Sequence, residues 1–231
     1  MDLKTKVEKY KREAFKPIIS NETSNESLLD SKFGGKPFLS KEYTWPVCEC
    51  GELMAFFLQL SSSHLPSKLN KAEVFGEGLL QLFYCIKCDN YEPFTNTHKI
   101  RLIKFENMDA NMDASEIKSN FEYHKINDWQ EFFDYPRYDE ILDLENLNDN
   151  EADQYENEYK SKAGEKLLGW PHWVQGVEYV NCPVCTKQMR YIFQIDSERN
   201  IDYMFGDMGV GHLSMCNQDH PDQFVFTWAC C

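Results

Sequence analysis

The sequence is short of basic residues and of long apolar runs, and each shortage excludes a class of protein. Its 231 residues include 24 Lys and Arg against 38 Asp and Glu, which gives a formal net charge of −14. Because affinity for a nucleic-acid backbone comes mainly from Lys and Arg, this balance argues against a nucleic-acid binder. No apolar run approaches the roughly 20 residues that a membrane helix needs, so we expect no membrane span.

The N-terminus also lacks an apolar segment that would direct the chain to an oxidising compartment. Its first residues, MDLKTKVEKYKREAFKP, are rich in Lys and Glu. We therefore expect a cytoplasmic protein with reduced thiols. The nine cysteines are an odd number, and in this setting clustered cysteines are more often metal ligands than disulfides.

Local patterns predict a few elements. The 3,4 spacing of Leu3, Val7, Tyr10 and Ala14 predicts an N-terminal helix that ends at Pro17. The short apolar runs at 53–60 and 79–84 predict buried strands, and the alternation at 224–229 predicts a final strand.

The two halves of the sequence repeat one order of features. The turn FGGKPFL at 33–39 is echoed by LLGWPHW at 167–173, and in both the proline precedes the next cysteine by eleven residues. A cysteine pair, a strand, a glycine turn and a second strand follow in each half. We predict an α+β, mainly β fold of two pseudo-repeated antiparallel β units with zinc knuckles and an N-terminal helix.

The predicted organisation is a single domain over residues 1–231. The first repeat unit spans 30–100 and the second spans 165–231. Residues 101–164 are interpreted as an acidic linker or insertion, because nine acidic residues and no basic one lie between Tyr138 and Tyr159. This stretch is either a solvated helix and loop or an acidic arm that steers a basic client.

Seven cysteines and one histidine have the spacing of two structural metal sites. Two short ligand pairs in each unit, separated by a strand or hairpin, favour a closed tetrahedral Zn²⁺ site with no open position for a reacting water. The alternatives are that the cysteines are buried free thiols, or that Cys230 or Cys231 replaces His220. The predicted ligands are Cys48, Cys50, Cys85 and Cys88 in the first unit, and Cys182, Cys185, Cys216 and His220 in the second.

Three tryptophans lie near the two proline turns, at comparable places in the two units. Trp45, Trp170 and Trp173 either pack in the core or line a groove between the units that holds an extended peptide. The second alternative makes them candidate partner-binding residues.

At these motifs the sequence resembles the YwqG-like family of unknown function. The residues that carry the resemblance are Phe33 to Pro37, Trp45-Pro46, Met54 to Gln59, Gly206-Asp207, and Cys216 through His220-Pro221 to Trp228. The chain is also similar to the wider superfamily that includes programmed cell death protein 2, although 168–173 has one glycine fewer than that superfamily's Gly-Gly-x-Pro-x-Trp turn. The resemblance implies a duplicated, largely β fold without known enzymatic activity, in a superfamily with adaptors or chaperones of a ribosomal protein and with immunity-type proteins.

These observations predict a non-enzymatic, zinc-stabilised protein-interaction module, adaptor-like or chaperone-like, with a protein or peptide client that could be basic. The alternatives are a hydrolase-type enzyme with a site between the repeats, and a toxin-immunity protein. The oligomeric state stays open.

Overall fold

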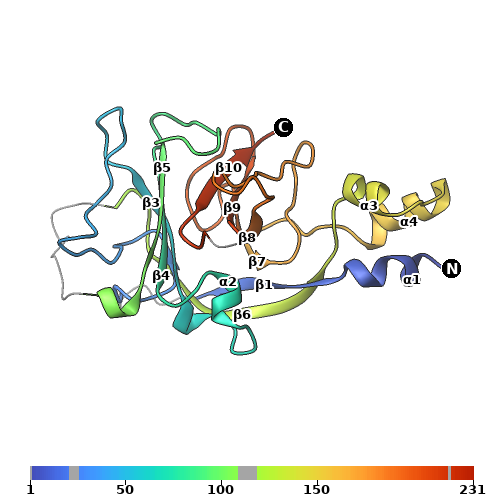
Figure 1. Cartoon of the computed structure of the whole chain (residues 1–231), viewed down its shortest axis with the longest axis horizontal. Coiled ribbons are helices and arrows are strands. Elements are labelled where there is room, and N and C mark those ends of the chain that lie inside the picture. Colours follow the sequence, from blue (N-terminus) through green and yellow to red (C-terminus); the bar gives the residue numbers. More distant parts are fainter. Residues whose placement is uncertain (1, 21–25, 109–118, 218–219) are drawn as a thin grey trace.

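The computed structural model describes residues 2–20, 26–108, 119–217 and 220–231, and it is mainly β (Figure 1). One ten-stranded sheet has the order β10-β9-β8-β7-β1-β6-β2-β3-β4-β5. Neighbouring strands pair antiparallel throughout, as between β1 and β6 or β8 and β9. The sheet curls so far that its end strands approach, and the ring of His98 on β5 lies 6.5 Å from that of Phe226 on β10. Trp228 Nε1 on β10 also donates to the hydroxyl of Tyr84 on β4 at 2.8 Å.

The sheet has a central pair of strands and two arms. The central pair is β1 (Arg12–Ile19) and β6 (His124–Asp134). One arm is β2 (Lys32–Phe33), β3 (Ala55–Ser61), β4 (Leu79–Tyr84) and β5 (His98–Ile103). The other arm is β7 (Lys166–Leu168), β8 (Arg190–Asp196), β9 (Val210–Met215) and β10 (Phe224–Ala229). Each arm is a short strand followed by a three-stranded meander.

The main core lies between the two arms and is rich in aromatic residues among its aliphatic ones. Every residue of β3 and β4 is buried, which explains why both read as continuous apolar runs rather than as alternating strands. Phe33 meets Phe193 across the arms with ring centroids 6.0 Å apart, and Tyr84 meets Phe226 at 5.7 Å. The space between the arms is therefore packed with side chains, at the place where the sequence suggested a peptide groove or an enzyme site.

The N-terminal helix is shorter than predicted. α1 (Leu3–Val7) and a 3₁₀ turn (Glu8–Tyr10) follow the 3,4 pattern, but β1 begins at Arg12 and contains Pro17. The prediction of a helix through Ala14 is wrong because this stretch pairs with β6 over eight residues. Pro17 lies past the two residues of β1 that pair with β7, where a missing N–H costs no ladder bond on that side.

The acidic segment is an ordered pair of helices. α3 (Tyr138–Leu144) and α4 (Asp149–Glu158) pack with α1 at one end of the molecule, beside the N-terminus (Figure 1). Ile141 and Tyr155 are buried in this contact, and Asn148 caps α4 by accepting from the backbone N–H of Glu151. The acidic stretch is therefore helical, as in the first of the two alternatives given above, but one face of the two helices is buried.

Residues 101–164 contribute more than these helices. They also hold the long strand β6, while 109–118 lie outside the described residues. The remaining short elements are α2 (Lys71–Val74) and 3₁₀ turns at Ser62–His64 and Phe105–Asn107. Among the described residues, no helix has the length and apolar character to cross a membrane.

Candidate metal centres and a nearby cavity

The first four predicted cysteines converge at the tip of the β3–β4 arm. A β-bridge between Val47 and Leu53 folds the turn that carries the first two cysteines, and β4 leads directly into the second two. The four Sγ atoms of Cys48, Cys50, Cys85 and Cys88 all lie within 4.8 Å of one another. Cys48 Sγ is 3.7 Å from Cys88 Sγ, and Cys50 Sγ is 3.6 Å from Cys85 Sγ.

The second predicted set converges in the same way. Cys182, Cys185, Cys216 and His220 have their ligand atoms within 4.8 Å of one another. Cys216 Sγ lies 3.6 Å from Cys185 Sγ and 3.7 Å from His220 Nδ1. Cys230 instead lies against Gly206, so among the described residues His220 is the fourth member of the group.

These spacings fit a tetrahedral metal. Four thiolates at about 2.3 Å from a zinc ion are about 3.8 Å apart, close to the 3.6–3.7 Å observed between the sulfur atoms. Two cysteine-rich clusters could therefore hold a metal ion, each with four protein ligands.

The thiols of the first cluster perturb one another strongly. A backbone N–H bond from Glu52 lowers the pKa of Cys50 to about 7, whereas hydrogen bonds to Cys50 and to the other two thiols raise the pKa of Cys88 to about 12. Burial also raises the pKa of Cys48. Without a metal the ionisation of one thiol therefore opposes that of its neighbours. A bound cation would remove this opposition, because metal ligation favours the thiolate form of every cysteine.

In the second cluster the backbone favours the charged form of one thiol. Burial opposes ionisation of Cys182, but backbone N–H groups of Cys185 and Val184 donate to its sulfur, and the net effect lowers its pKa. N–H groups turned toward a sulfur are what a thiolate ligand requires.

Each cluster rests on its own small core. The first packs on Trp45, Phe56 and Phe83, and the second packs on Met189 and Val225. A metal ion would therefore brace the end of each arm rather than the aromatic core between them.

The three candidate tryptophans do not meet in one groove. Trp45 is 7% exposed, and its Nε1 donates to the carbonyl of Met54 at 2.7 Å. Trp170 and Trp173 are each 6% exposed. The Trp173 ring packs on His212 with centroids 4.7 Å apart. Trp173 also meets Tyr179 with centroids 5.0 Å apart, so it lies in the same region as Trp170, whereas Trp45 packs in the first arm.

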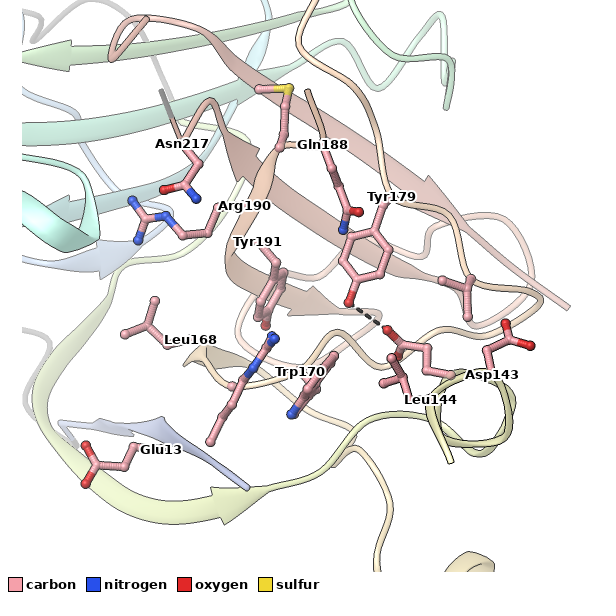
Figure 2. Close-up of a pocket in the computed structure, with 15 residues that line it drawn as sticks. Glu13, Asp143, Leu144, Leu168, Trp170, Tyr179, Gln188, Arg190, Tyr191 and Asn217 are labelled. Carbon is pink, nitrogen blue, oxygen red and sulfur yellow. Dashed lines mark hydrogen bonds between the residues drawn. The ribbon is translucent and has the colours of Figure 1, made fainter. Parts of the chain in front are cut away.

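A cavity of about 880 Å³ lies beside β8 and the acidic helices (Figure 2). Arg190 and Asn217 lie at one end, Tyr179 and Asp143 lie at the other, and Trp170 stands between them. Apart from Trp170, sequence reasoning did not find this site, because its walls come from segments far apart in the chain and no motif marks them.

Contacts and burial shift the pKa values of the charged groups that line the cavity. The Tyr179 hydroxyl donates to Glu140 at 2.7 Å, and burial raises the pKa of Glu140 despite this bond. Arg12 stacks on Trp170 with its guanidinium carbon 3.3 Å from the ring centroid. Burial lowers the pKa of both Arg12 and Arg190.

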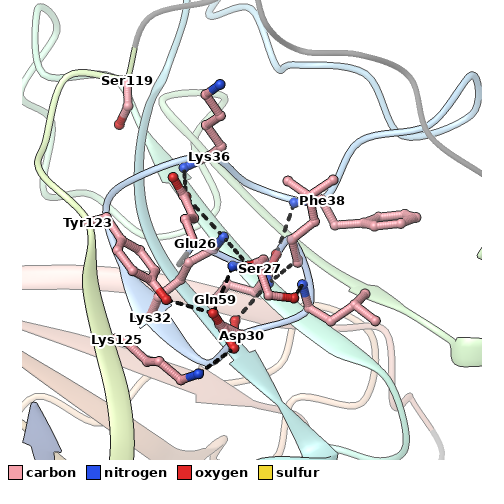
Figure 3. Close-up of polar contacts among 12 residues, drawn as sticks. Glu26, Ser27, Asp30, Lys32, Lys36, Phe38, Gln59, Ser119, Tyr123 and Lys125 are labelled. Carbon is pink, nitrogen blue, oxygen red and sulfur yellow. Dashed lines mark hydrogen bonds and ion pairs between the residues drawn. The ribbon is translucent and has the colours of Figure 1, made fainter. Parts of the chain in front are cut away.

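A polar network holds the glycine turn of the first arm (Figure 3). The buried Lys32 donates to the Ser27 carbonyl at 2.9 Å and pairs with Glu26 at 3.2 Å. Gln59 donates to the Asp30 carbonyl at 2.8 Å and accepts from the Phe38 N–H at 3.2 Å. These groups bond to one another and to the backbone of the turn, so the network stabilises the turn.

The second arm has a corresponding network. Lys166 is fully buried and pairs with Asp134 at 2.7 Å. Gln194 donates to the Gly164 carbonyl at 2.8 Å and accepts from the His172 N–H at 2.8 Å. A buried lysine and a buried glutamine thus hold the turn of each arm.

Comparison with known protein families gives a match over most of the chain. The family model described as Domain of unknown function (DUF1963) matches residues 31–230. A search of the curated proteins finds no match.

Proposed function

We propose that this chain, which belongs to the DUF1963 family of unknown function, is a cytoplasmic, non-enzymatic, zinc-stabilised protein-interaction module of the YwqG-like type. The observation that carries the proposal is a pair of closed ligand sets on a sheet that also presents an ordered, acidic helical surface.

Zinc is supported by the donors and their number. Thiolates and one imidazole at tetrahedral spacing suit Zn²⁺ better than they suit Mg²⁺ or Ca²⁺, which take oxygen ligands. Four protein ligands in each set leave no coordination position for a substrate or a reacting water. The role proposed for both ions is therefore structural.

An internal duplication is supported by matching details of the two arms. Ladder registers shift at Phe56/Leu58 in one arm and at Tyr191/Phe193 in the other. Gly34 has a φ of 56°, and Leu168, at the place where the repeat lacks its glycine, has a φ of 60°. The backbone thus keeps the left-handed turn although leucine is disfavoured there.

The surface proposed for the client is the exposed face of α4. Asp149, Asp153, Glu156 and Glu158 are all exposed, and α4 contains no basic residue. Such a surface attracts a basic partner over about a Debye length, roughly 10 Å at 0.1 M salt, and the attraction weakens as salt rises.

The test neutralises this face without removing it. Deleting the helices would expose the Ile141 and Tyr155 contacts, so we choose Asp149→Asn, Asp153→Asn, Glu156→Gln and Glu158→Gln together. The matched control carries Glu42→Gln, Glu77→Gln, Glu92→Gln and Glu106→Gln, four exposed positions elsewhere in the described chain.

The measurement is a pull-down from native cells with wild-type and both variants, at low and at high ionic strength. We expect a basic protein that is captured at low salt by wild type and by the control, and that is lost with the α4 variant. Equal capture by all three proteins would contradict a role for the acidic face.

A further inference from the structure

The cavity beside β8 lies where the sheet opens at the end of β7. β7 pairs with only two residues of β1 and two of β8. Leu168 and Gly169 have φ values of 60° and 81°, so the chain turns out of the sheet here. Since β1 and β8 flank β7, they are two strand spacings apart, about 10 Å. Arg12 and Tyr191 line the gap, which is one strand wide.

The corresponding place in the other arm is closed by the chain itself. The Phe121 carbonyl accepts from the Gly35 N–H at 3.1 Å, and the Phe121 ring is buried in the core. β7 pairs with β1 as β2 pairs with β6, with Phe15 opposite Leu167 and His124 opposite Phe33. Three residues before each of these positions, Arg12 precedes Phe15 as Phe121 precedes His124. A buried ring thus closes one arm, whereas an arginine side chain lines the cavity of the other.

Two guanidinium groups face this cavity, and neither forms an ion pair with a carboxylate of the lining. Arg12 stacks on Trp170, and Arg190 donates to two backbone carbonyls at the end of α2. Within the described part of the chain neither forms an ion pair, unlike Arg137 and Arg199. The Nε of Arg190 is also buried and without a partner there. The carboxylates of the lining have other partners, since Glu13 pairs with Lys68 at 2.8 Å and Glu140 accepts from Tyr179 at 2.7 Å. Two arginines without an ion pair of their own favour an anionic ligand.

The other lining groups suit a peptide. Leu168, Met189 and Val177 provide apolar wall, and the side-chain amides of Gln188 and Asn217 can bond to a main chain. A volume of about 880 Å³ lies in the range of ligand sites.

We propose that this cavity binds an extended peptide segment that carries a carboxylate, held by Arg12 and Arg190 in the gap that β7 leaves between β1 and β8. The carboxylate comes from an acidic side chain or from a chain terminus. The site is separate from the exposed face of α4, so it stands or falls independently of the proposed basic client.

The test uses dye-labelled pentapeptides and fluorescence anisotropy. One probe is Thr-Val-Glu-Val-Thr with a blocked C-terminus, the second has Gln in place of Glu, and the third is the Gln peptide with a free C-terminal carboxylate. We expect the Glu probe or the free-terminus probe to bind at least about tenfold tighter than the blocked Gln probe, because each gains a charge-assisted bidentate bond. Which of the two binds tighter identifies the source of the carboxylate.

Two variants and a control locate the site. Arg12→Gln should abolish the advantage of the carboxylate probes, and Val177→Trp should weaken all probes by filling the cavity. Arg199→Gln removes the same charge outside the cavity and should change nothing. Thermal unfolding of each variant verifies that it is folded.

Three results would overturn the proposal. The first is equal binding of the charged probes and the blocked Gln probe. The second is an equal loss with Arg199→Gln and Arg12→Gln. The third is saturation by inorganic phosphate without binding of any peptide, which would make the cavity a plain anion site.

Discussion

Removing one thiolate from the second cluster should halve the metal content of the protein. Cys182→Ser takes away a buried ligand of the set that includes Cys185, Cys216 and His220 and leaves three donors, whereas the first cluster, at the tip of the other arm, is untouched. We therefore expect two zinc ions per chain in wild type and one in the variant, counted by native mass spectrometry.

The effect on stability follows from linkage. A site that exists only in the folded state adds RT ln(1 + [M]/Kd), which is about 1.4 kcal/mol for each tenfold rise of free metal above Kd. Two sites add about 2.7 kcal/mol per decade, and one site adds about half of that. For a chain of this size 1 kcal/mol shifts Tm by about 2–4 °C. The expected slopes are about 5–11 °C per decade for wild type and about 3–6 °C for the variant.

The assay is thermal unfolding in a series of zinc buffers that spans several decades of free metal. Cys230→Ser is the matched control, because Cys230 lies against Gly206 and outside the cluster. The control should keep both ions and the wild-type slope.

Two outcomes would refute this reasoning. A wild-type Tm that does not change with free zinc would exclude two structural zinc sites. An ion lost from Cys230→Ser as well as from Cys182→Ser would mean that the fourth ligand comes from the C-terminus rather than from His220.

Two further predictions concern buried charge. Burial lowers the pKa of His98 to about 4 and that of His212 to about 3, whereas both titrate near 6.5 when unfolded, so the unfolded chain binds more protons below pH 6.5. Stability is therefore full above pH 6.5 and falls by about 2 kcal/mol per histidine down to pH 5, measured as urea midpoints, and a midpoint that does not change over this range would contradict it. Lys166→Met leaves the buried Asp134 carboxylate uncompensated and should cost about 3–5 kcal/mol, which the double variant with Asp134→Asn should partly restore. A loss below about 1 kcal/mol would show that water replaces the lysine.

The elements that local patterns predicted are those with strong local signals. The apolar runs at 53–60 and 79–84 became β3 and β4, and the alternation at 224–229 became β10. The eight candidate ligands came together because short spacing fixes each knuckle and a hairpin brings the second knuckle beside it.

The N-terminal strand was missed because its stability is not local. Leu3, Val7 and Tyr10 have helical spacing, and nothing between Arg12 and Pro17 outweighs that pattern in a short window. β1 is instead held by a ladder to β6, in which Arg12 lies opposite Asp134. A pairing across more than a hundred residues leaves no periodic trace in either segment.

The cavity was missed for a related reason. Arg12, Glu140, Trp170 and Arg190 meet only because β7 stops after three residues and leaves β1 and β8 apart. The sequence feature that could have indicated it is Leu168, which stands where the matching turn of the first arm has Gly34, since a departure from a shared pattern marks a place where the two arms can differ.

The segments outside residues 30–100 and 165–231 do more than link the two arms, because they supply the central strands β1 and β6. β1 lies before the first unit, and β6 lies in 101–164, yet each pairs with the other and with the first strand of one arm. Phe33 and Phe193, one from each arm, meet in the core that this pair spans. A unit cut at 30–100 or 165–231 would lose its neighbouring strand and expose half of that core. The two arms are therefore stable together, on a shared strand pair, and the two cysteine-rich clusters lie only at their far ends.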